Sequence, residues 1–308
     1  MLCVRKGIEI LRRLFDNRND SGSVLLVVLL LLVFIVTIVT EFAYDIYVST
    51  SGLHNWQVGV RLRELADSAV DVAKLTIEEE QRKRSYTYPE TLTFPILIQG
   101  VEDTLVVEVR DEQARFNINS LVFPNGNDNR KAIEEFRRLL SLLDLDEKIA
   151  DLTADWIDPD MIARPGGGEE ESQNRYFLTI DEFAASKWFD KEKIKKLLPY
   201  ITVYGDMDGR ININTAKKEN IMALLPSIGE DTAEGLIRYR EEHPLKSTSE
   251  LRNVAGFENL ISSLAGRYVV KSSVFGIMAT VSDGRIRRKV EEVVDFSQGK
   301  KVLYRRSI

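Results

Sequence analysis

The sequence predicts a mixed α+β protein, in which one long N-terminal helix packs on an antiparallel sheet and a large all-helical domain interrupts that sheet. Three observations support this fold class. Residues 21–40 are uniformly apolar and lead into a helical stripe. Alternating strand patterns occur at residues 91–110 and again after residue 268, and helical patterns fill the sequence between them.

The apolar segment at residues 21–40 reads SGSVLLVVLLLLVFIVTIVT, without a charge, and Asp20 and Glu41 flank it. At about 1.5 Å per residue, a helix of this length reaches roughly 30 Å, the thickness of the hydrocarbon core of a bilayer. A surface helix of a soluble protein is apolar along one stripe only, whereas this segment is apolar on every face. A cleavable signal peptide has an apolar run of only about 7–15 residues. We therefore predict a retained membrane helix.

The segment before this helix is basic. Its charged residues are five cations and three anions, namely Arg5, Lys6, Arg12, Arg13 and Arg18 against Glu9, Asp16 and Asp20. Positively charged flanks remain in the cytoplasm, so we expect a cytoplasmic N-terminus and export of everything after the helix. The sole cysteine, Cys3, lies in this segment, so the exported part must fold without an internal disulfide.

An amphipathic pattern continues the helix beyond Glu41. Apolar residues recur at steps of three and four: Leu53, Trp56, Val60, Leu62, Leu65, Ala66, Ala69, Val72, Ala73 and Ile77. The charged run EEEQRKR ends near Arg84, and Pro89 prevents any further continuation. We predict one helix of up to about 60 residues, with possible bends at Gly52 and Gly59.

Short strands are expected on both sides of the helical region: residues 91–99 and 104–110, then 268–281, 285–296 and 301–306. The last two connections, residues 282–284 and 297–299, each end in glycine and suit hairpin turns. The two groups of strands need not pair with each other, but separate groups would leave exposed edges.

The helical region carries an internal repeat. ARFNINSL at residues 114–121 is echoed by GRININTA at residues 209–216, and each copy leads into helical patterns. Those patterns cover residues 130–143, 191–198 and 232–242. We interpret the region as a duplication. Its paired asparagines suit bonds to neighbouring backbone, and we expect Asn119 or Asn214 to cap the helix that follows.

An acidic cluster stands out within the helical region. Residues 144–182 hold twelve carboxylates and three basic side chains, a net charge of −9 in a chain whose total is −6. Asp155, Asp158 and Asp160 fall within six residues, where Pro159 stops a helix, and residues 166–168 are glycines that allow a tight return to Glu169 and Glu170. Oxygen ligands on glycine-bearing loops suit Ca²⁺. From these residues alone, a solvated acidic loop is an equally good interpretation.

Neither an enzyme nor a DNA-binding protein is favoured. His54 and His243 have no Ser, Cys or metal-ligand partner at useful spacing, and no phosphate loop is present. Residues 224–251 resemble the helix-hairpin-helix module of competence-type DNA receptors, whose glycine turn offers backbone amides to a phosphate. Here Ser227 replaces a glycine, and Glu230 and Asp231 stand where the phosphate would bind. The motif Asp206-Met-Asp208-Gly209 imitates a calcium loop, but we expect a turn.

The beginning of the chain resembles the class III leader of type IV prepilins: a basic segment, Gly22, the small residue Ser23 and an unbroken apolar helix. The resemblance implies that a prepilin peptidase cuts between Gly22 and Ser23. Most pilins carry Phe or Met as the first mature residue, so Ser23 is a departure from the pattern, and the leader is longer than many.

The longer motifs DEQARFNIN, DWIDPD, GGGEE, DGRININTA and LLPSIGEDTA, together with this leader, resemble the family of general secretion pathway protein K, the large minor pseudopilin of type II secretion. The resemblance covers essentially the whole chain. It implies a pseudopilin fold with an inserted helical domain that contains two helix-hairpin-helix-like or SAM-like repeats. It also implies bound Ca²⁺, with Asp155, Asp158, Asp160, Glu169 and Glu170 as the expected ligands.

We accordingly divide the chain into five segments: a leader at 1–22, the helix at 23–84, the first strands at 85–113, the inserted helical domain at 114–266 and the final strands at 267–308. The expected function is that of a minor pseudopilin at the pseudopilus tip, which initiates or caps assembly for protein export. The expected partners are minor pseudopilins I and J, the major pseudopilin, the prepilin peptidase and the inner membrane, with the head in the periplasm. The alternative is a membrane-tethered DNA-binding protein of the competence type, although no nucleic acid is expected.

The fifth residue of the predicted mature chain is Val27. Pilins that resemble this chain carry a buried glutamate there, which pairs with the N-terminal amine of the adjoining subunit nearer the tip. No acid lies between Ser23 and Thr40, so this chain lacks the carboxylate for a neighbour above it. Its own amine at Ser23 can still receive a glutamate from below, and we therefore expect it to cap a filament.

Overall fold

The computed structural model describes residues 21–88, 93–97, 104–168, 172–188 and 191–308. The chain forms two compact units, Met1–Val60 and Arg61–Ile308. Most of the predicted leader and two of the predicted ligands, Glu169 and Glu170, lie outside the described residues.

Helix α2, Ser21–Lys83, contributes to both units. Its part in the first unit carries the apolar segment, whose most apolar window has a mean hydropathy of 3.2 and is exposed among the described residues. The hydroxyls of Thr37 and Thr40 donate to the backbone oxygens of Val33 and Val36, at 2.8 and 2.7 Å, so these polar groups are satisfied within the helix. By length and composition, the helix can serve as a single-pass membrane anchor.

The second part of α2 lies against the sheet of the second unit. The stripe that it buries is Leu62, Ala66, Ala69, Val70, Ala73 and Ile77. The helix is not interrupted at Gly52 or Gly59, and it ends one residue before Arg84, as predicted. Lys271 closes this end, because its Nζ donates to the backbone oxygens of Gln81 and Arg84, at 2.6 and 2.9 Å. A cation is favourable at the negative end of a helix dipole.

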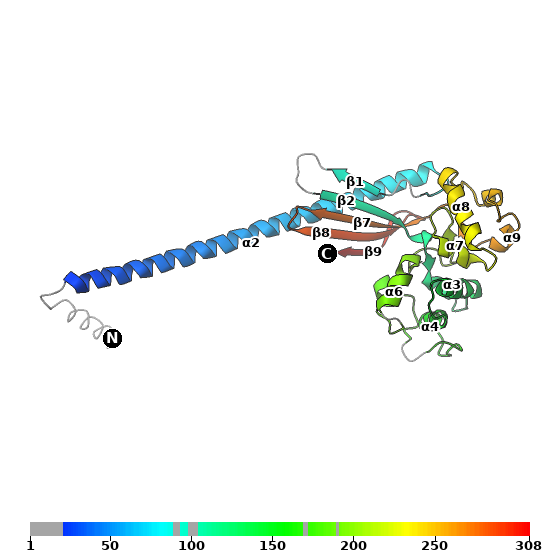
Figure 1. Ribbon diagram of the computed structural model, residues 1–308, viewed down its shortest axis with the longest axis horizontal. Coiled ribbons are helices and arrows are strands. Elements are labelled where there is room, and N and C mark those ends of the chain that lie inside the picture. Colours follow the sequence, from blue (N-terminus) through cyan, green and yellow to red (C-terminus); the bar gives the residue numbers. More distant parts are fainter. Residues whose placement is uncertain (1–20, 89–92, 98–103, 169–171, 189–190) are drawn as a thin grey trace. The chain divides into compact units, whose positions relative to one another are not determined.

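The sheet of the second unit has five antiparallel strands in the order β1-β2-β7-β8-β9 (Figure 1). They are β1 Thr93–Leu97, β2 Thr104–Asp111, β7 Val274–Ser282, β8 Arg287–Asp295 and β9 Lys301–Ser307. The two predicted groups of strands therefore do pair: β2 lies beside β7, with Thr104 opposite Ser282 and Asp111 opposite Phe275. Both predicted hairpin turns are present, and their glycines, Gly284 and Gly299, have φ of +90° and +98°.

One predicted strand is wrong. Residues 268–281 were expected to form a single strand, but β6, Tyr268–Val269, belongs to a different small sheet from β7. The backbone between them crosses from one sheet to the other and is held by side chains. Thr87 Oγ1 accepts from Ser272 N at 3.1 Å, and Gln113 Oε1 accepts from Ser273 N at 2.6 Å. An apolar pattern alone does not reveal such a crossing.

Between β2 and β7 lie two helical repeats, at one end of the sheet (Figure 1). The first contains α3 Arg130–Leu142, α4 Lys148–Ile157, α5 Ile180–Ala184 and α6 Lys191–Leu197. The second contains α7 Lys218–Leu224, α8 Glu230–Glu242 and α9 Ile261–Leu264. Short 3₁₀ helices complete the connections: η2 Glu112–Ala114, η3 Ile118–Leu121, η4 Leu198–Tyr200 and η5 Thr248–Asn253. Each repeat has its own buried apolar core.

A two-residue parallel strand pair closes each repeat. In the first repeat β3, Phe116–Asn117, pairs with β4, Ile201–Thr202. In the second repeat β5, Ile211–Asn212, pairs with β6. Each pair joins the beginning of its repeat to its end, so the two repeats have the same plan. The predicted duplication is confirmed.

The asparagines of the repeated motif occupy equivalent positions. Asn119 Nδ2 donates to the backbone oxygens of Phe177 and Val203, and its Oδ1 accepts from Phe177 N, at 2.9, 3.0 and 2.9 Å. Asn214 makes the same three bonds with Leu245 and Val270. The structural role predicted for them is confirmed, but the predicted capping is wrong. Each side chain instead bonds backbone far along the chain, and α3 is capped by Asn129.

Asp111 ties the sheet to the second repeat. Its buried carboxylate accepts from the hydroxyls of Ser272 and Thr215, both at 2.6 Å, and from Asn212 Nδ2 at 2.9 Å. Burial raises the pKa of Asp111, while these hydrogen bonds oppose the rise. The predicted turn at Asp206-Met-Asp208-Gly209 is also confirmed: Gly209 N donates to the backbone oxygen of Asp206 at 3.1 Å, and Gly209 has φ of +77°.

Candidate functional site

The predicted processing site lies in the first turns of α2. Gly22 is exposed, and a Cβ added to it would meet no atom of the described residues within 4 Å. A glycine is unfavourable within a helix by about 1 kcal/mol relative to alanine. The described part of the chain therefore provides no packing reason for glycine at this position, and its role as the cleavage residue stays a prediction. Val27 lies in the same helix and is half-buried.

The acidic loop, residues 155–168 of the predicted acidic cluster, begins in the last turn of α4. Asp155 is in the last turn of the helix, and Asp158 is its C-cap residue, with φ of −68° and ψ of 153°. This extended conformation is the one that a following proline favours, so Pro159 stops the helix as predicted. Both aspartates are buried, with 0% and 1% of their surface exposed. The end of the helix thus directs two carboxylates into the protein.

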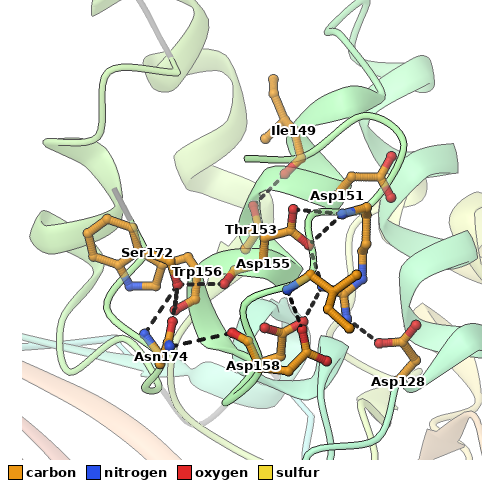
Figure 2. A network of polar contacts seen from close by, with 12 residues as sticks. Asp128, Ile149, Asp151, Thr153, Asp155, Trp156, Asp158, Ser172 and Asn174 are labelled. Atoms are coloured by element: carbon orange, nitrogen blue, oxygen red, sulfur yellow. Dashed lines mark hydrogen bonds and ion pairs between the residues drawn. The ribbon is translucent and has the colours of Figure 1, made fainter. Parts of the chain in front are cut away.

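Arg164 donates hydrogen bonds to both carboxylates. Figure 2 shows Asp155 and Asp158 on one side of this network and Asp128 beside it. Arg164 Nη1 donates to Asp155 Oδ1 and to Asp158 Oδ2, and its Nη2 donates to Asp128. Its backbone N–H also donates to Asp155 Oδ2 at 3.1 Å. Burial alone would lower the pKa of Arg164, but the three carboxylates raise it above its ordinary value. The guanidinium is therefore a permanent cation at the centre of the loop.

The glycine run passes close to two carboxylates of α4, those of Asp151 and Asp155. The predicted return to Glu169 and Glu170 lies outside the described residues. A Cβ added to Gly167 would lie 1.8 Å from Asp155 Oδ2, and one added to Gly166 would lie 2.8 Å from Asp151 Oδ2. Gly167 N donates to the backbone oxygen of Arg164 at 3.0 Å. Only glycine allows the backbone to approach these oxygens so closely.

The predicted ligands are placed differently from one another. Asp155 and Asp158 are brought together, whereas Asp160 is exposed and accepts from Ile162 N at 2.8 Å. Glu169 and Glu170 lie outside the described residues. Sequence reasoning missed Asp128, which lies 36 residues before Arg164 and joins the loop only in the folded chain. It also missed Arg164, although an arginine within so acidic a stretch was a visible signal.

The loop fits a hard cation in its donor chemistry. Three aspartates surround one arginine, so the local charge is negative, and all the side-chain acceptors are oxygens. Asp158 Oδ1 is buried and has no hydrogen-bond partner among the described residues. Burial raises the pKa of Asp158, against the effect of Arg164. Within the same described residues, no three Asp, Glu, His or Cys side chains are already grouped to hold a metal ion.

Two basic side chains of the second repeat, Lys218 and Arg240, are both engaged within the repeat. Lys218 is paired with Glu230 and with Glu234, the latter at 3.2 Å. Arg240 points inward and donates to the backbone oxygens of Ile213 and Ala216, at 2.6 and 2.8 Å. Burial lowers the pKa of Arg240 to about 10. This arginine holds the repeat together and is not available to a phosphate.

Comparisons with known proteins agree with this architecture. Residues 114–206 match the family model described as Type II secretion system (T2SS), protein K, and residues 208–266 match a helix-hairpin-helix motif. The Type II secretion system protein K of Aeromonas hydrophila is 26% identical over 314 residues, which cover 92% of this chain and 94% of that protein.

A solved structure has the same fold. It is a chain in the crystal structure of the GspK-GspI-GspJ complex from the type 2 secretion system of enterotoxigenic Escherichia coli, with a TM-score of 0.67 and 19% identity. The similarity covers 84% of this chain and 99% of that chain. The predicted fold class, a pseudopilin fold with an inserted helical domain that holds a helix-hairpin-helix motif, is confirmed.

Proposed function

Because the chain belongs to the family of type II secretion system protein K, a minor pseudopilin, we propose that it sits at the tip of the pseudopilus and initiates or caps its assembly. The filament would serve the export of folded proteins across the outer membrane. The single observation that carries this proposal is the absence of an acid from Ser23 to Thr40 in the apolar part of α2.

The argument depends on what a buried carboxylate requires. An ionised carboxylate in an apolar helix bundle is strongly unfavourable unless a cation pairs with it. In a chain that carries such an acid near its mature N-terminus, the amine of the neighbour nearer the tip supplies that cation. Val27 has no carboxylate, so this chain requires no cation from a neighbour nearer the tip and cannot bind that neighbour through an ion pair. A chain of this kind therefore ends the filament on the side of the tip.

Minor pseudopilins I and J are the partners that we propose for the tip. The fold matches a chain from a complex that contains both of them, which supports this assignment. The major pseudopilin would follow below, and the prepilin peptidase would cleave the leader beforehand. We further propose that the N-terminus begins in the cytoplasm and the head lies in the periplasm, because the basic residues precede the apolar segment.

Site-specific crosslinking tests the tip position. Cleavage after Gly22 removes Cys3, so a cysteine placed at Val24 would be the only one in the mature chain. We expect it to capture one minor-pseudopilin neighbour below and none above. Val27→Glu should restore a neighbour above, whereas Val28→Glu, which has the same charge at the adjacent position, should not. Regular spacing of the wild-type chain along the filament shaft would refute the proposal.

We also propose that the acidic loop binds Ca²⁺ through Asp155 and Asp158, with Asp160, Glu169 and Glu170 as further expected ligands. Asp158 Oδ1, which has no hydrogen-bond partner among the described residues, supports this assignment. A cation that binds only the folded state stabilises it by roughly 2.7 kcal/mol at a hundredfold excess over its Kd. The full chain in detergent should therefore melt earlier in chelator than in calcium, and Asp158→Ala should shrink the difference. Asp146→Ala, an exposed acid in the same repeat, should leave it unchanged.

Identical melting curves in calcium and in chelator, on protein verified to be free of metal beforehand, would refute the calcium proposal.

A further inference from the structure

Arg164 occupies the space between the two carboxylates that Ca²⁺ would need. A single nitrogen, Nη1, donates to one oxygen of Asp155 and one oxygen of Asp158. A calcium ion contacts its oxygen ligands at about 2.4 Å, so an ion shared by these two oxygens would overlap the position of Nη1. The guanidinium and the ion therefore exclude each other.

Two further observations indicate a site that is built for a cation and only partly satisfied by arginine. Asp158 is 1% exposed, yet its Oδ1 has no hydrogen-bond partner among the described residues. Arg164 Nε is likewise buried without a partner within that part of the chain. A guanidinium presents its donors in one plane, so it cannot reach every oxygen that converges on it. A spherical ion with flexible coordination has no such restriction.

We propose that Arg164 is a built-in counter-ion that competes with a divalent cation for Asp155 and Asp158 and thereby sets the affinity of the acidic loop for Ca²⁺. This inference rests on the calcium site proposed above. Without the metal, Arg164 neutralises part of the buried charge and keeps the loop folded. When the metal binds, the guanidinium withdraws from Asp155 and Asp158.

Asp128 provides a place for the arginine to go. It accepts from Nη2, on the outer side of the guanidinium, and its side chain is 41% exposed, compared with 0% and 1% for Asp155 and Asp158. Arg164 can therefore leave the two buried carboxylates while its bond to the exposed one persists. The bond to Asp128 reduces the free energy lost when Arg164 withdraws from Asp155 and Asp158, and it makes the exchange reversible.

The decisive variant is Arg164→Met, which keeps an unbranched stem and removes the guanidinium with its charge. Calcium is titrated calorimetrically into the chelator-treated full chain in detergent. Displacing charge-assisted hydrogen bonds opposes binding in the wild type, so we expect the Kd for Ca²⁺ to fall about tenfold or more in the variant. In chelator the variant should melt earlier than the wild type, and saturating calcium should remove that difference.

Arg137→Met is the matched control. Arg137 pairs with Asp151, one turn before Asp155 on α4, whereas the ion pairs of Asp155 and Asp158 among the described residues are with Arg164. The control variant removes the same charge from the same region, so a purely long-range electrostatic effect would raise calcium affinity equally in both variants. We expect the Kd of Arg137→Met to stay within about twofold of the wild type. Arg164→Lys keeps the charge but loses the forked donors of the guanidinium, so it should bind calcium less tightly than Arg164→Met and more tightly than the wild type. If the Met variant does not fold, the comparison of Arg164→Lys with the wild type tests the competition.

The outcomes separate the two proposals. If the wild type and Arg164→Met bind calcium equally, or if both methionine variants bind it more tightly to the same extent, competition by Arg164 is refuted while the calcium site stands. Weaker binding by Arg164→Met would show that the arginine assists the metal, and it would also overturn the inference. If neither the wild type nor the variants bind calcium, both proposals fail.

Discussion

Replacing the repeated asparagines tests whether they hold the two helical repeats closed. Asn119→Ala and Asn214→Ala each remove three side-chain hydrogen bonds to backbone that lies at least 31 residues away. Both side chains are buried, with 4% and 0% of their surface exposed. Water therefore cannot readily replace the lost partners, and Phe177 N and Leu245 N lose their acceptors.

The expected loss of stability follows from the number of hydrogen bonds removed. A hydrogen bond contributes about 0.5–1.5 kcal/mol net, and a buried group left without a partner adds a desolvation penalty, so we expect each variant to lose about 3 kcal/mol of unfolding free energy. For a folded unit of this size, such a loss lowers Tm by roughly 6–12 °C. Because the two asparagines make equivalent bonds, the two losses should be similar. Asn125→Ala, in an exposed turn, should change stability by about 0.5 kcal/mol or less.

Thermal melting of the full chain in detergent measures the size of the effect, and hydrogen exchange locates it. Asn119→Ala should speed exchange at Phe177, and Asn214→Ala should speed exchange at Leu245, each without the reciprocal effect. A change in Tm below about 2 °C in both variants would show that these bonds do not close the repeats. A large effect in one variant alone would refute their equivalence.

Three further predictions concern other parts of the chain. Gly167→Ala should destabilise the first repeat by about 1–3 kcal/mol, because its Cβ would lie 1.8 Å from Asp155 Oδ2, whereas Gly168→Ala, whose nearest neighbour would be at 3.8 Å, should be nearly neutral in the same melting assay. Burial raises the pKa of Glu135 from 4.5 to about 7, although Arg267 opposes this rise. The contribution of protonated Glu135 to the free energy of unfolding is therefore complete below pH 4.5 and is lost as pH rises through 7. The loss is at most about 3 kcal/mol, and Glu135→Gln should remove this part of the pH dependence; parallel pH profiles of the two proteins would contradict the assignment. Cleavage after Gly22 removes five cations and three anions and leaves a mature chain of net charge −8. Intact-mass measurement after co-expression with a prepilin peptidase should detect the loss of residues 1–22. An uncut chain would contradict the predicted leader.

Much of the fold follows from patterns that are local in sequence. The apolar run and the stripe after it define α2, and alternation with glycine turns defines the β7-β8-β9 meander. The pairing of β2 with β7 could not be predicted, because register across an insertion depends on where the folded insertion brings its ends. The parallel pairs β3-β4 and β5-β6 were missed for a different reason: two residues are too few to show a period.

The acidic loop was predictable only within its own segment. Asp155, Asp158 and the glycine return are close in sequence, and their convergence follows from Pro159 and from the close approach that glycine permits. Asp128 enters from a separate loop, and nothing in the spacing connects it to Arg164. Likewise, the asparagine motif revealed a duplication, but the distant backbone groups that its side chains bind are defined only by the closed repeats.

The position of the insertion also determines the order in which the chain can fold. Asp111 and Phe275 are opposite each other in the sheet, so β2 and β7 can pair only after the 163 residues between them have brought their ends together. An unstructured loop of that length carries a large closure entropy, whereas two folded repeats, each joining its own beginning to its end, shorten the effective loop to a few residues. We infer that the repeats form first and that the sheet closes afterwards. Until then, β2 keeps one edge unpaired, and a chain delayed at this stage exposes a strand edge to its neighbours.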